Sequence, residues 1–559
     1  MINEYPRPQF RRDSYYCLNG IWQFAVSEST DFPDVFPETI LVPYPPESEN
    51  SGIHRRIKPS ETMYYRTIFT LPKDFKEDRV LLHFGGVDQI CEVFLNGILL
   101  GKHEGGYLPF YFDISESLQD INELIVKATD SLDHKYPWGK QRSDNGGMWY
   151  TPFSGIWQTV WIENVPSIYL KSVRITPSLS SVQIDFYDSQ PGCFDTTLTI
   201  ISAENTCEWS FSDNSVSVPI SNPHHWTPED PFLYKMIIRR GRDLVYSYFA
   251  LRTISISESN GIPRILLNGK PYFFHGLLDQ GYWEKGLCIP DSDNGYDKDI
   301  LYAKSLGFNM LRKHIRIEPL PFYEACDRIG MIVFQDFVNN GPHRYFRDTL
   351  LPNFGFVYED DKKRKISPEV KKIFKDTMIQ TVSHLYNSPC IAYWTIFNEG
   401  WGQFQSDAMY ELLKATDNTR VIDSTSGWFW QSKSDVDSYH LYFTKLKQFG
   451  GKRPLVLSEF GGYSYNTSGN RYGYKFFKTK EEYKKAVANL YYHMIIPSVK
   501  KGLCASVYTQ LSDVEDEQNG LITYDRTVQK FTPEDLIPIS QLLSHAILTE
   551  DFIPPELDK

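Results

Sequence analysis

The chain has 559 residues, of which 41% are hydrophobic and 23% charged, so it can bury several cores and is not a disordered polymer. Its formal net charge of −12 argues against non-specific binding to nucleic acid and against a basic membrane-binding surface. Aromatic residues make up 15%, a content that suits β-sandwich cores and also platforms that stack on sugar rings.

The cysteines and the N-terminal residues indicate in which cellular compartment the protein is expected. The eight cysteines are scattered, with no CxxC pair and no zinc-ligand spacing, which is typical of reduced thiols in a cytosolic protein. Residues 1–8 lack the apolar stretch of a signal peptide, and no window reaches the roughly 18 apolar residues of a membrane span. We therefore predict a cytoplasmic protein that has neither a membrane nor a nucleic acid as partner.

Residues 1–165 are expected to form a β-sandwich of jelly-roll type. Short alternating apolar runs occur at 80–84 and 91–95, and the second run ends at Asn96-Gly97. An Asn-Gly pair favours a type I′ turn, so this run should continue as a hairpin. The segment has no convincing helical period, and two packed sheets are the natural way to bury such strands.

Residues 166–255 continue in short strands, but their number and length indicate a separate, smaller unit. Strand-like runs occur at 181–184, 197–200 and 244–248. A segment of this length made of strands and turns predicts an immunoglobulin-like β-sandwich.

Residues 256–559 have a different pattern, in which helices end at a glycine and a buried strand follows. The expected order is helix 299–306, strand 308–312, helix 321–328 and strand 331–335, with later strands at 391–396, 454–457 and 503–508. Helix–glycine–strand alternation over this length predicts a parallel sheet with crossover helices, closed as a C-terminal (β/α)₈ TIM barrel.

Two of the predicted barrel strands end in glutamate. One strand runs into Asn398-Glu399 and the other into Ser458-Glu459, with glycine close behind in both cases. Barrel active sites lie at the carboxyl ends of the strands, and glycoside hydrolysis needs two facing carboxyl groups there. One is a protonated acid for the leaving oxygen, and the other is an anion that faces the anomeric carbon. The alternative for a single such glutamate is a structural salt bridge, but a pair indicates catalysis.

Further stretches carry a family resemblance along nearly the whole chain. They lie at residues 18–24, 154–161, 225–234 and 267–271. Together with Asn398-Glu399 and the Ser458-Glu459 stretch, they resemble glycoside hydrolase family 2, the family of β-galactosidases, β-glucuronidases and β-mannosidases. The resemblance implies that Glu399 is the acid/base and Glu459 the nucleophile of a retaining double displacement, with no cofactor.

Four residues near the glutamates are expected to serve the substrate. Asn398 can hydrogen-bond the sugar 2-hydroxyl. By resemblance, Arg312 matches a family arginine on the floor of the site, where a guanidinium can keep the nucleophile ionised. Tyr442 falls where the family has a tyrosine that hydrogen-bonds the nucleophile, and Trp401 is a candidate for stacking on a sugar face. The alternatives are an ordinary ion pair for Arg312 and core packing for Tyr442, and Trp394, which also flanks Glu399, is expected to pack in the core.

Departures from the family pattern affect the choice of sugar. Trp149 stands where family β-galactosidases and β-glucuronidases carry an aspartate. Asp279 follows the first barrel strand in place of their Arg-His-Glu, and its carboxylate can bind two sugar hydroxyls. The Asn-x-Lys signature by which relatives hold a glucuronate carboxylate is not evident. After the last strand, Gln510 is expected to line the sugar site, and the acidic run 513–517 could bind a cation, although no metal is predicted.

The loop after the third barrel strand contains Arg344 and Arg347. It belongs to the active-site face, and two arginines there could hold a C6 carboxylate bidentately. The alternatives are solvated loop arginines or a contact between subunits of a homo-oligomer.

The sequence therefore predicts an exo-acting, retaining β-glycosidase whose partner is a carbohydrate with a terminal β-sugar. The expected sugar is galacto-configured, either a β-D-galactoside or a β-D-galacturonide. A β-glucuronidase is the next alternative, followed by a β-mannosidase or an α-L-arabinosidase. A non-catalytic carbohydrate-binding protein and a purely structural assembly protein are the alternatives from other classes.

Overall fold

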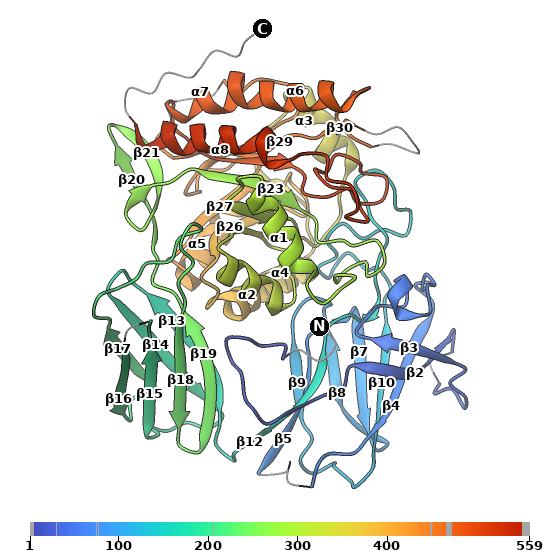
Figure 1. Ribbon diagram of the computed structural model, residues 1–559. Helices are drawn as coiled ribbons and strands as arrows, with labels where there is room; N and C mark the ends of the chain where they lie inside the picture. The colour runs from blue at the N-terminus through green and yellow to red at the C-terminus, as the bar shows by residue number, and fades with distance from the viewer. Residues whose placement is uncertain are drawn as a thin grey trace.

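The computed structural model describes residues 5–29, 31–73, 75, 78–203, 205–447, 450–465 and 472–549. Figure 1 shows two β-sandwiches side by side, with the barrel above them in this view. Part of the N-terminal stretch from which the absence of a signal peptide is predicted, residues 1–4, lies outside the described residues. Among the described helices, none is both long and apolar enough to cross a bilayer.

The first sandwich consists of a six-stranded and a four-stranded antiparallel sheet, with their shared core between them. In sheet order the larger contains β3 (Glu38–Val42), β2 (Gly20–Ser27), β4 (Thr62–Phe69), β10 (Asn122–Thr129), β7 (Ile90–Leu95) and β8 (Ile98–Glu104). The smaller contains β1 (Tyr15–Cys17), β12 (Val160–Val165), β5 (Arg79–Phe84) and β9 (Phe110–Asp113). Short elements complete the unit: η1 (Glu49–Ser51), β6 (Val87–Asp88) and β11 (Gly155–Ile156). The predicted hairpin is confirmed, because β7 pairs with β8 and both Asn96 and Gly97 have positive φ.

The second sandwich is smaller, as expected. One sheet contains β13 (Leu170–Pro177), β14 (Ser181–Asp188) and β17 (Ser215–Pro219). The other contains β16 (Thr206–Phe211), β15 (Thr196–Ile201), β18 (Tyr234–Arg240) and β19 (Asp243–Phe249). Inward residues of both sheets, such as Ile184, Leu198 and Ile238, form one core.

The predicted barrel is confirmed as an eight-stranded, nearly closed parallel sheet. Its strands in chain order are β23 (Phe274–Asp279), β24 (Met310–Lys313), β25 (Ile332–Asp336), β26 (Ile391–Asn398), β27 (Val421–Ser426), β28 (Asp437–Leu441), β29 (Leu455–Gly461) and β32 (Leu503–Thr509). β32 pairs with β23, which joins the last strand to the first.

Helices surround the barrel strands. They are α1 (Gly295–Ser305), α2 (Leu320–Ile329), α3 (Leu351–Asn353), α4 (Pro368–Leu385), α5 (Ser406–Thr416), α6 (Lys480–Leu490), α7 (Ile496–Val499) and α8 (Pro533–Leu548). Shorter elements are η2 (Phe346–Leu350), η3 (Asp361–Lys363), η4 (Tyr491–Ile495) and the strand pair β30 (Tyr463–Tyr465) and β31 (Lys475–Phe477).

A small antiparallel sheet precedes the barrel. It contains β20 (Ile254–Ser259), β21 (Ile262–Leu267) and β22 (Lys270–Pro271), so the 267–271 stretch belongs to this sheet and the first barrel strand begins only at Phe274. Arg264 of β21 donates hydrogen bonds to the carbonyls of Val499 and Leu503. The sheet is thereby fixed to the amino end of β32, away from the end where a barrel active site forms.

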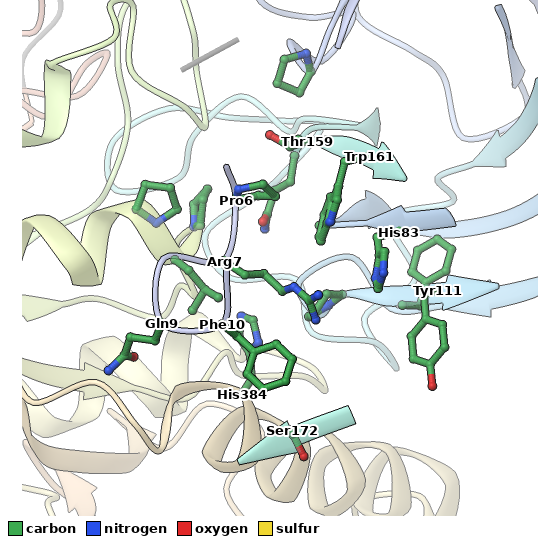
Figure 2. A pocket seen from close by; sticks show the side chains of 18 of the residues that line it. Pro6, Arg7, Gln9, Phe10, His83, Tyr111, Thr159, Trp161, Ser172 and His384 are labelled. Carbon is green, nitrogen blue, oxygen red and sulfur yellow. The ribbon is translucent and has the colours of Figure 1, made fainter. Parts of the chain in front are cut away.

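The N-terminal segment joins the domains. Arg12 forms buried ion pairs with Glu163 of the first sandwich (2.9 Å) and Asp243 of the second (2.7 Å). Beside this cluster lies a cavity of about 330 Å³, lined by the N-terminal segment, both sandwiches and the end of α4 (Figure 2). Neither predicted catalytic glutamate lines this cavity. The buried ion pairs define how the two sandwiches sit against each other.

Candidate active site

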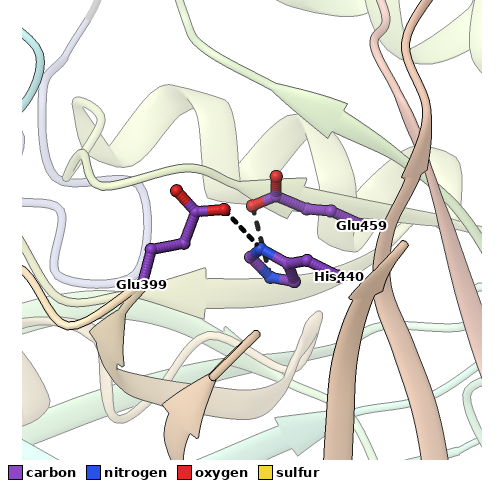
Figure 3. A group of neighbouring side chains, drawn as sticks. All are labelled: Glu399, His440 and Glu459. Atoms are coloured by element: carbon purple, nitrogen blue, oxygen red, sulfur yellow. Dashed lines mark hydrogen bonds and ion pairs between the residues drawn. The ribbon is translucent and has the colours of Figure 1, made fainter. Parts of the chain in front are cut away.

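Glu399 and Glu459 meet at the carboxyl end of the barrel. Glu399 directly follows β26, and Glu459 lies near the end of β29, three strands further along the chain. One carboxylate oxygen of each, together with one ring nitrogen of His440, lie within 4.8 Å of one another (Figure 3). Both glutamates are buried, with exposed fractions of 8% and 4%. The structure therefore brings together the two carboxyl groups that the sequence singled out.

The backbone around Glu399 explains the glycine that follows it. Glu399 has a φ of 52°, a backbone conformation that residues other than glycine rarely adopt. Its N–H donates to the carbonyl of Ser426. At Gly400, also with positive φ, a Cβ atom would lie 2.5 Å from the Phe429 ring. Such left-handed non-glycine residues concentrate at functional sites.

Glu459 is held as an anion by several donors. Burial alone would raise its pKa, but the charges of His440, His314 and Arg312 and the hydrogen bond from Tyr442 outweigh it and lower the pKa to about 2. Arg312 Nη1 lies 2.9 Å from Glu459 Oε1, and the Tyr442 hydroxyl donates to Oε2. Burial lowers the pKa of His314 to about 4, so this histidine is neutral at neutral pH. Burial also acts to lower the pKa of Arg312, but the charges of Asp336 and Glu459 outweigh it and raise this pKa, so the guanidinium stays charged.

Glu399 has the opposite tendency. Burial raises its pKa, and the charge of Glu459 adds to that rise, while a hydrogen bond with His440 acts against it. His440 Nδ1 lies 2.7 Å from Glu399 Oε1, and its Nε2 lies 3.5 Å from Glu459 Oε1. The imidazole thus bridges the two carboxyl groups. Glu399 favours its own protonated form, whereas Glu459 favours its anion.

Arg312 organises the floor of the site. It is fully buried and donates to Asp336 (3.0 Å), Glu459 and Asn398 Oδ1 (2.8 Å). The side-chain oxygen of Asn398 accepts the hydrogen bond from Arg312. The side-chain NH₂ group of Asn398 is therefore the part that can donate to a substrate. Tyr442 stacks on Tyr474 with ring centroids 3.6 Å apart, which fixes its hydroxyl beside Glu459.

The two tryptophans predicted near the sugar form part of an aromatic cluster. Trp401 stacks on Trp149 and Trp138, at centroid distances of 5.0 and 6.1 Å. Trp401 is only 1% exposed and Trp149 8%. Trp149 comes from the first sandwich, so this cluster brings a sandwich loop against the segment that carries Glu399. The enclosed Trp401 ring supports that segment instead of presenting an open face.

Asp279 is the last residue of β23, and Gln510 directly follows the adjacent strand β32. Asp279 is ion-paired with Lys313 at 2.6 Å and also accepts the N–H of Gly281. Gln510 accepts a hydrogen bond from Gln280 at 2.8 Å, and its own amide nitrogen is buried without a partner among the described residues. Both side chains are therefore engaged in the floor of the barrel end.

The two loop arginines differ in their surroundings. Arg347 forms an ion pair with the adjacent Asp348 at 2.5 Å and lies 4.0 Å from Glu359. Arg344 is exposed and contacts Asp348 through its backbone: its N–H donates to the Asp348 carboxylate, and its carbonyl accepts the Asp348 N–H. The structure does not bring either guanidinium into the hydrogen-bond network of Glu399 and Glu459.

The acidic run 513–517 holds protein groups. Glu515 accepts from Asn145 and from the N–H of Thr151, and Glu517 accepts the Tyr150 hydroxyl. Asp513 pairs with Lys530 at 2.6 Å. The run thus docks the 145–151 loop of the first sandwich onto the barrel.

Comparisons with known proteins place the chain in a family. Residues 261–531 match the TIM barrel domain of glycosyl hydrolases family 2, and residues 45–151 match the galactose-binding domain-like part of glycosyl hydrolase 2. The chain belongs to glycoside hydrolase family 2. The predicted family is therefore confirmed.

Sequence relatives of this family 2 chain are distant. A β-galactosidase of Thermoanaerobacter pseudethanolicus is 24% identical over 80% of this chain and 60% of its own length, and one of Priestia megaterium is 23% identical over 82% and 49%. The chain thus spans about half to three-fifths of the length of these relatives.

Solved structures share the fold over nearly the full chain. A β-D-glucuronidase of Dictyoglomus thermophilum has a TM-score of 0.75 at 17% identity, covering 99% of this chain and 100% of its own. A β-galacturonidase of Eisenbergiella tayi has a TM-score of 0.69 at 18% identity, covering 98% of both chains. At such identities the likeness establishes the fold alone.

Sequence reasoning missed two histidines in this family 2 site. His440 precedes Tyr442 by two residues, and His314 follows Arg312 by two. Alternate residues of an extended strand share a face. His440 could therefore be expected on the face of Tyr442, and His314 on the face of Arg312. His314 lies 2.8 Å from Asp336 Oδ2 and supports the carboxylate that faces Arg312.

Glu399, His440 and Glu459 are the residues whose donor atoms could surround a cation, since they lie within 4.8 Å of one another. The Arg312 guanidinium already donates to Glu459 Oε1, and His440 Nε2 lies 3.1 Å from the Ser426 hydroxyl. A metal ion would compete with these contacts. The donor set therefore matches a hydrogen-bonded acid/base pair better than a metal centre.

Proposed function

We propose that the protein is a retaining exo-β-glycosidase that removes a terminal galacto-configured β-sugar, a galactoside or a galacturonide. The observation that carries this proposal is the close approach of Glu399 and Glu459, whose nearest oxygens lie within 4.8 Å. Retaining glycosidases place their two carboxyl groups roughly 5–5.5 Å apart, whereas inverting enzymes keep room for a water between them.

The opposite pKa shifts assign the roles. Glu459, with its pKa lowered, is the anion that attacks the anomeric carbon and forms a glycosyl-enzyme ester. As the bond from the anomeric carbon to the leaving oxygen breaks, Glu399, with its pKa raised, gives its proton to that oxygen. The resulting Glu399 carboxylate then takes a proton from water, whose oxygen attacks the anomeric carbon and releases Glu459.

Neighbouring residues support these steps. Asn398 donates to the sugar 2-hydroxyl, a contact that strengthens in the transition state. Arg312 and Tyr442 stabilise the Glu459 anion before attack and after release. Asp279, Gln510, Trp149 and Trp401 shape the surroundings of the sugar, and Arg344 and Arg347 remain candidates for contacts at the outer rim.

The choice of sugar rests on relatives of different kinds. The distant sequence relatives are named β-galactosidases, and one of the structural neighbours is named a β-galacturonidase. Other structural neighbours are named β-glucuronidases, which makes a β-glucuronide the second candidate.

A panel of 4-nitrophenyl β-glycosides tests the proposal. The sugars are galactose, galacturonic acid, glucuronic acid, glucose and mannose, with an α-L-arabinoside added. We expect a galacto-configured member to have the highest kcat/KM, and ¹H NMR of the first product to show the β-anomer. An α-anomer as first product would contradict the retaining mechanism, and turnover of none of the panel would contradict a glycosidase of this kind.

A further inference from the structure

A loop of the first sandwich crosses the carboxyl end of the barrel and carries a lysine. The loop is fixed by Trp138, whose backbone N–H donates to the Asn339 carbonyl (3.1 Å) and whose indole N–H donates to the Gly341 carbonyl (3.0 Å). At Gly139 a Cβ atom would lie 3.2 Å from the Ile315 carbonyl, so the backbone touches the segment after β24. Lys140 follows directly.

Lys140 is buried without an anion. Its exposed fraction is 8%, and its ammonium lies 5.5 Å from the centre of the Tyr150 ring. Three lysines are buried in the described part of the chain, and the other two have carboxylate partners: Lys313 pairs with Asp279 and Lys530 with Asp513. Among the described residues no hydrogen bond or ion pair reaches the Lys140 ammonium.

The charge of Lys140 acts on side chains around the predicted reaction centre. Burial is the main influence on the pKa of Glu399 and raises it, while the charge of Lys140 acts against this rise. Burial likewise lowers the pKa values of His314 and His343, and the charge of Lys140 adds to both decreases. These groups follow β26, β24 and β25, so the ammonium lies over the carboxyl ends of these three strands, one of which leads into Glu399.

The Lys140 residue is enclosed, but its ammonium nitrogen is not among the fully buried side-chain atoms of the described residues that lack a hydrogen bond. The ammonium therefore keeps contact with solvent and has no counter-charge beside it. The buried cations nearby do not share this state, since Arg312 has Glu459 and Asp336, and Lys313 has Asp279 and Glu318. An anionic group that enters with the substrate would supply the missing partner. A carboxylate on the terminal sugar is negatively charged and can accept charge-assisted hydrogen bonds from the ammonium group.

We propose that Lys140 is a specificity-determining residue that binds the carboxylate of an acidic terminal sugar, so that the preferred substrates are β-uronides. This inference rests on the proposed glycosidase function and selects acidic over neutral sugars: the galacturonide over the galactoside, with the glucuronide as the alternative uronide. In this proposal a loop of the first sandwich binds the sugar carboxylate. The loop after β25 is less suited to this role, because Arg347 is already paired with Asp348.

The test compares Lys140→Met with the wild type on 4-nitrophenyl β-D-galacturonide, β-D-glucuronide and β-D-galactoside. A charge-assisted contact at a shielded site corresponds to a loss of roughly 10- to 150-fold in kcat/KM. We expect the ratio of kcat/KM for the better uronide to that for the galactoside to fall by this factor. Lys140→Arg keeps the charge and should retain a larger part of the ratio than Lys140→Met.

Two controls accompany this comparison. Lys135→Met removes a half-buried lysine of the same loop, which is paired with Glu369, and should leave the ratio unchanged. Competitive inhibition by free galacturonate and by free galactose gives a second readout that does not need turnover. We expect Lys140→Met to weaken binding of galacturonate more than binding of galactose, by a comparable factor. Circular dichroism of the variants checks that each is folded.

The outcomes separate this inference from the proposed function. Equal losses on uronide and galactoside, with a moved alkaline pH limb, would mean that Lys140 acts through Glu399 and would overturn its role in binding. A selective loss in Arg347→Ala but not in Lys140→Met would also overturn it. Wild-type turnover of the galactoside without any uronide would refute the inference and leave the glycosidase intact, whereas no turnover of any aryl β-glycoside would refute the glycosidase itself.

Discussion

The surroundings of Glu399 and those of Glu459 differ far more than their positions do. Both glutamates end a barrel strand, and both are at least nine-tenths buried. Glu459 receives Arg312 and the Tyr442 hydroxyl, and its pKa falls to about 2, whereas Glu399 has His440 and the pKa is raised by burial. Burial raises the pKa of both carboxyl groups and therefore does not by itself define their roles. The hydrogen-bond donors and positive charges around Glu459 outweigh this rise and make Glu459 the anion.

Removal of the Glu459 carboxylate should have the largest effect. Glu459→Ala cannot form a glycosyl-enzyme ester, so we expect kcat to fall by a factor on the order of 10⁴ to 10⁶, as for loss of a nucleophile elsewhere. Added azide can take the place of the carboxylate, and the product should then be the α-glycosyl azide. Glu411→Ala, an exposed glutamate of α5, is the matched control and should behave as wild type. A β-glycosyl azide from Glu459→Ala would exchange the roles of the two glutamates.

Glu399→Gln should have a smaller effect that depends on the leaving group. The amide cannot donate an acid proton, so we expect losses of roughly 10²- to 10⁴-fold for an alkyl β-glycoside. An activated aryl glycoside, whose leaving oxygen needs little protonation, should lose much less in kcat/KM. A series of aryl glycosides with graded leaving-group pKa measures this dependence, and an equal loss across the series would argue against an acid role for Glu399.

Arg312→Lys tests the cation that distinguishes the two environments. A lysine keeps the charge but cannot donate to Glu459, Asp336 and Asn398 together, since it lacks the planar fork. We expect kcat/KM to fall by roughly 10- to 100-fold and the acidic limb of the pH profile to move up, because the Glu459 anion is less stabilised. Arg328→Lys, on the exposed side of α2, should leave both quantities unchanged. An unmoved acidic limb in Arg312→Lys would contradict the stated role.

His440→Asn should have the smallest effect, mainly on the pH profile. The active form has Glu459 ionised and Glu399 protonated, so activity is lost below the pKa of Glu459 and above that of Glu399. His440 acts to lower both pKa values, and its removal should therefore move both limbs to higher pH. The measurement is kcat/KM against pH, with His224→Asn as a surface control. A shift of either limb to lower pH would be inconsistent with this electrostatic account.

The sequence predicted the parts of the site that depend on local signals. Buried strands that end in glutamate and glycine indicated Glu399 and Glu459, and family resemblance added Arg312 and Tyr442. The strands β27 and β28 were not predicted, because their residues are largely polar: Val421–Ser426 ends in Asp-Ser-Thr-Ser and Asp437–Leu441 includes His440. A strand that lines a polar site lacks the apolar run by which a buried strand is recognised.

Residues that depend on distant parts of the chain were also beyond prediction. Lys140 lies 259 positions before Glu399, in a different domain. Its segment reaches the barrel through the hydrogen bonds of Trp138 and through the docking of the 145–151 loop by Glu515 and Glu517. The ion pair of Arg347 is a local feature of the sequence, since its partner Asp348 is the next residue.

Trapping of the covalent intermediate tests the central claim most directly. A 2-deoxy-2-fluoro β-glycosyl fluoride of the best panel sugar slows the second step more than the first, so the ester accumulates, and peptide mass spectrometry then locates the sugar. We predict a single labelled peptide with the sugar on Glu459, and no label in Glu459→Ala. A label on Glu399, or full inactivation with neither glutamate labelled, would contradict the assignment of the anion to Glu459 and of the acid to Glu399.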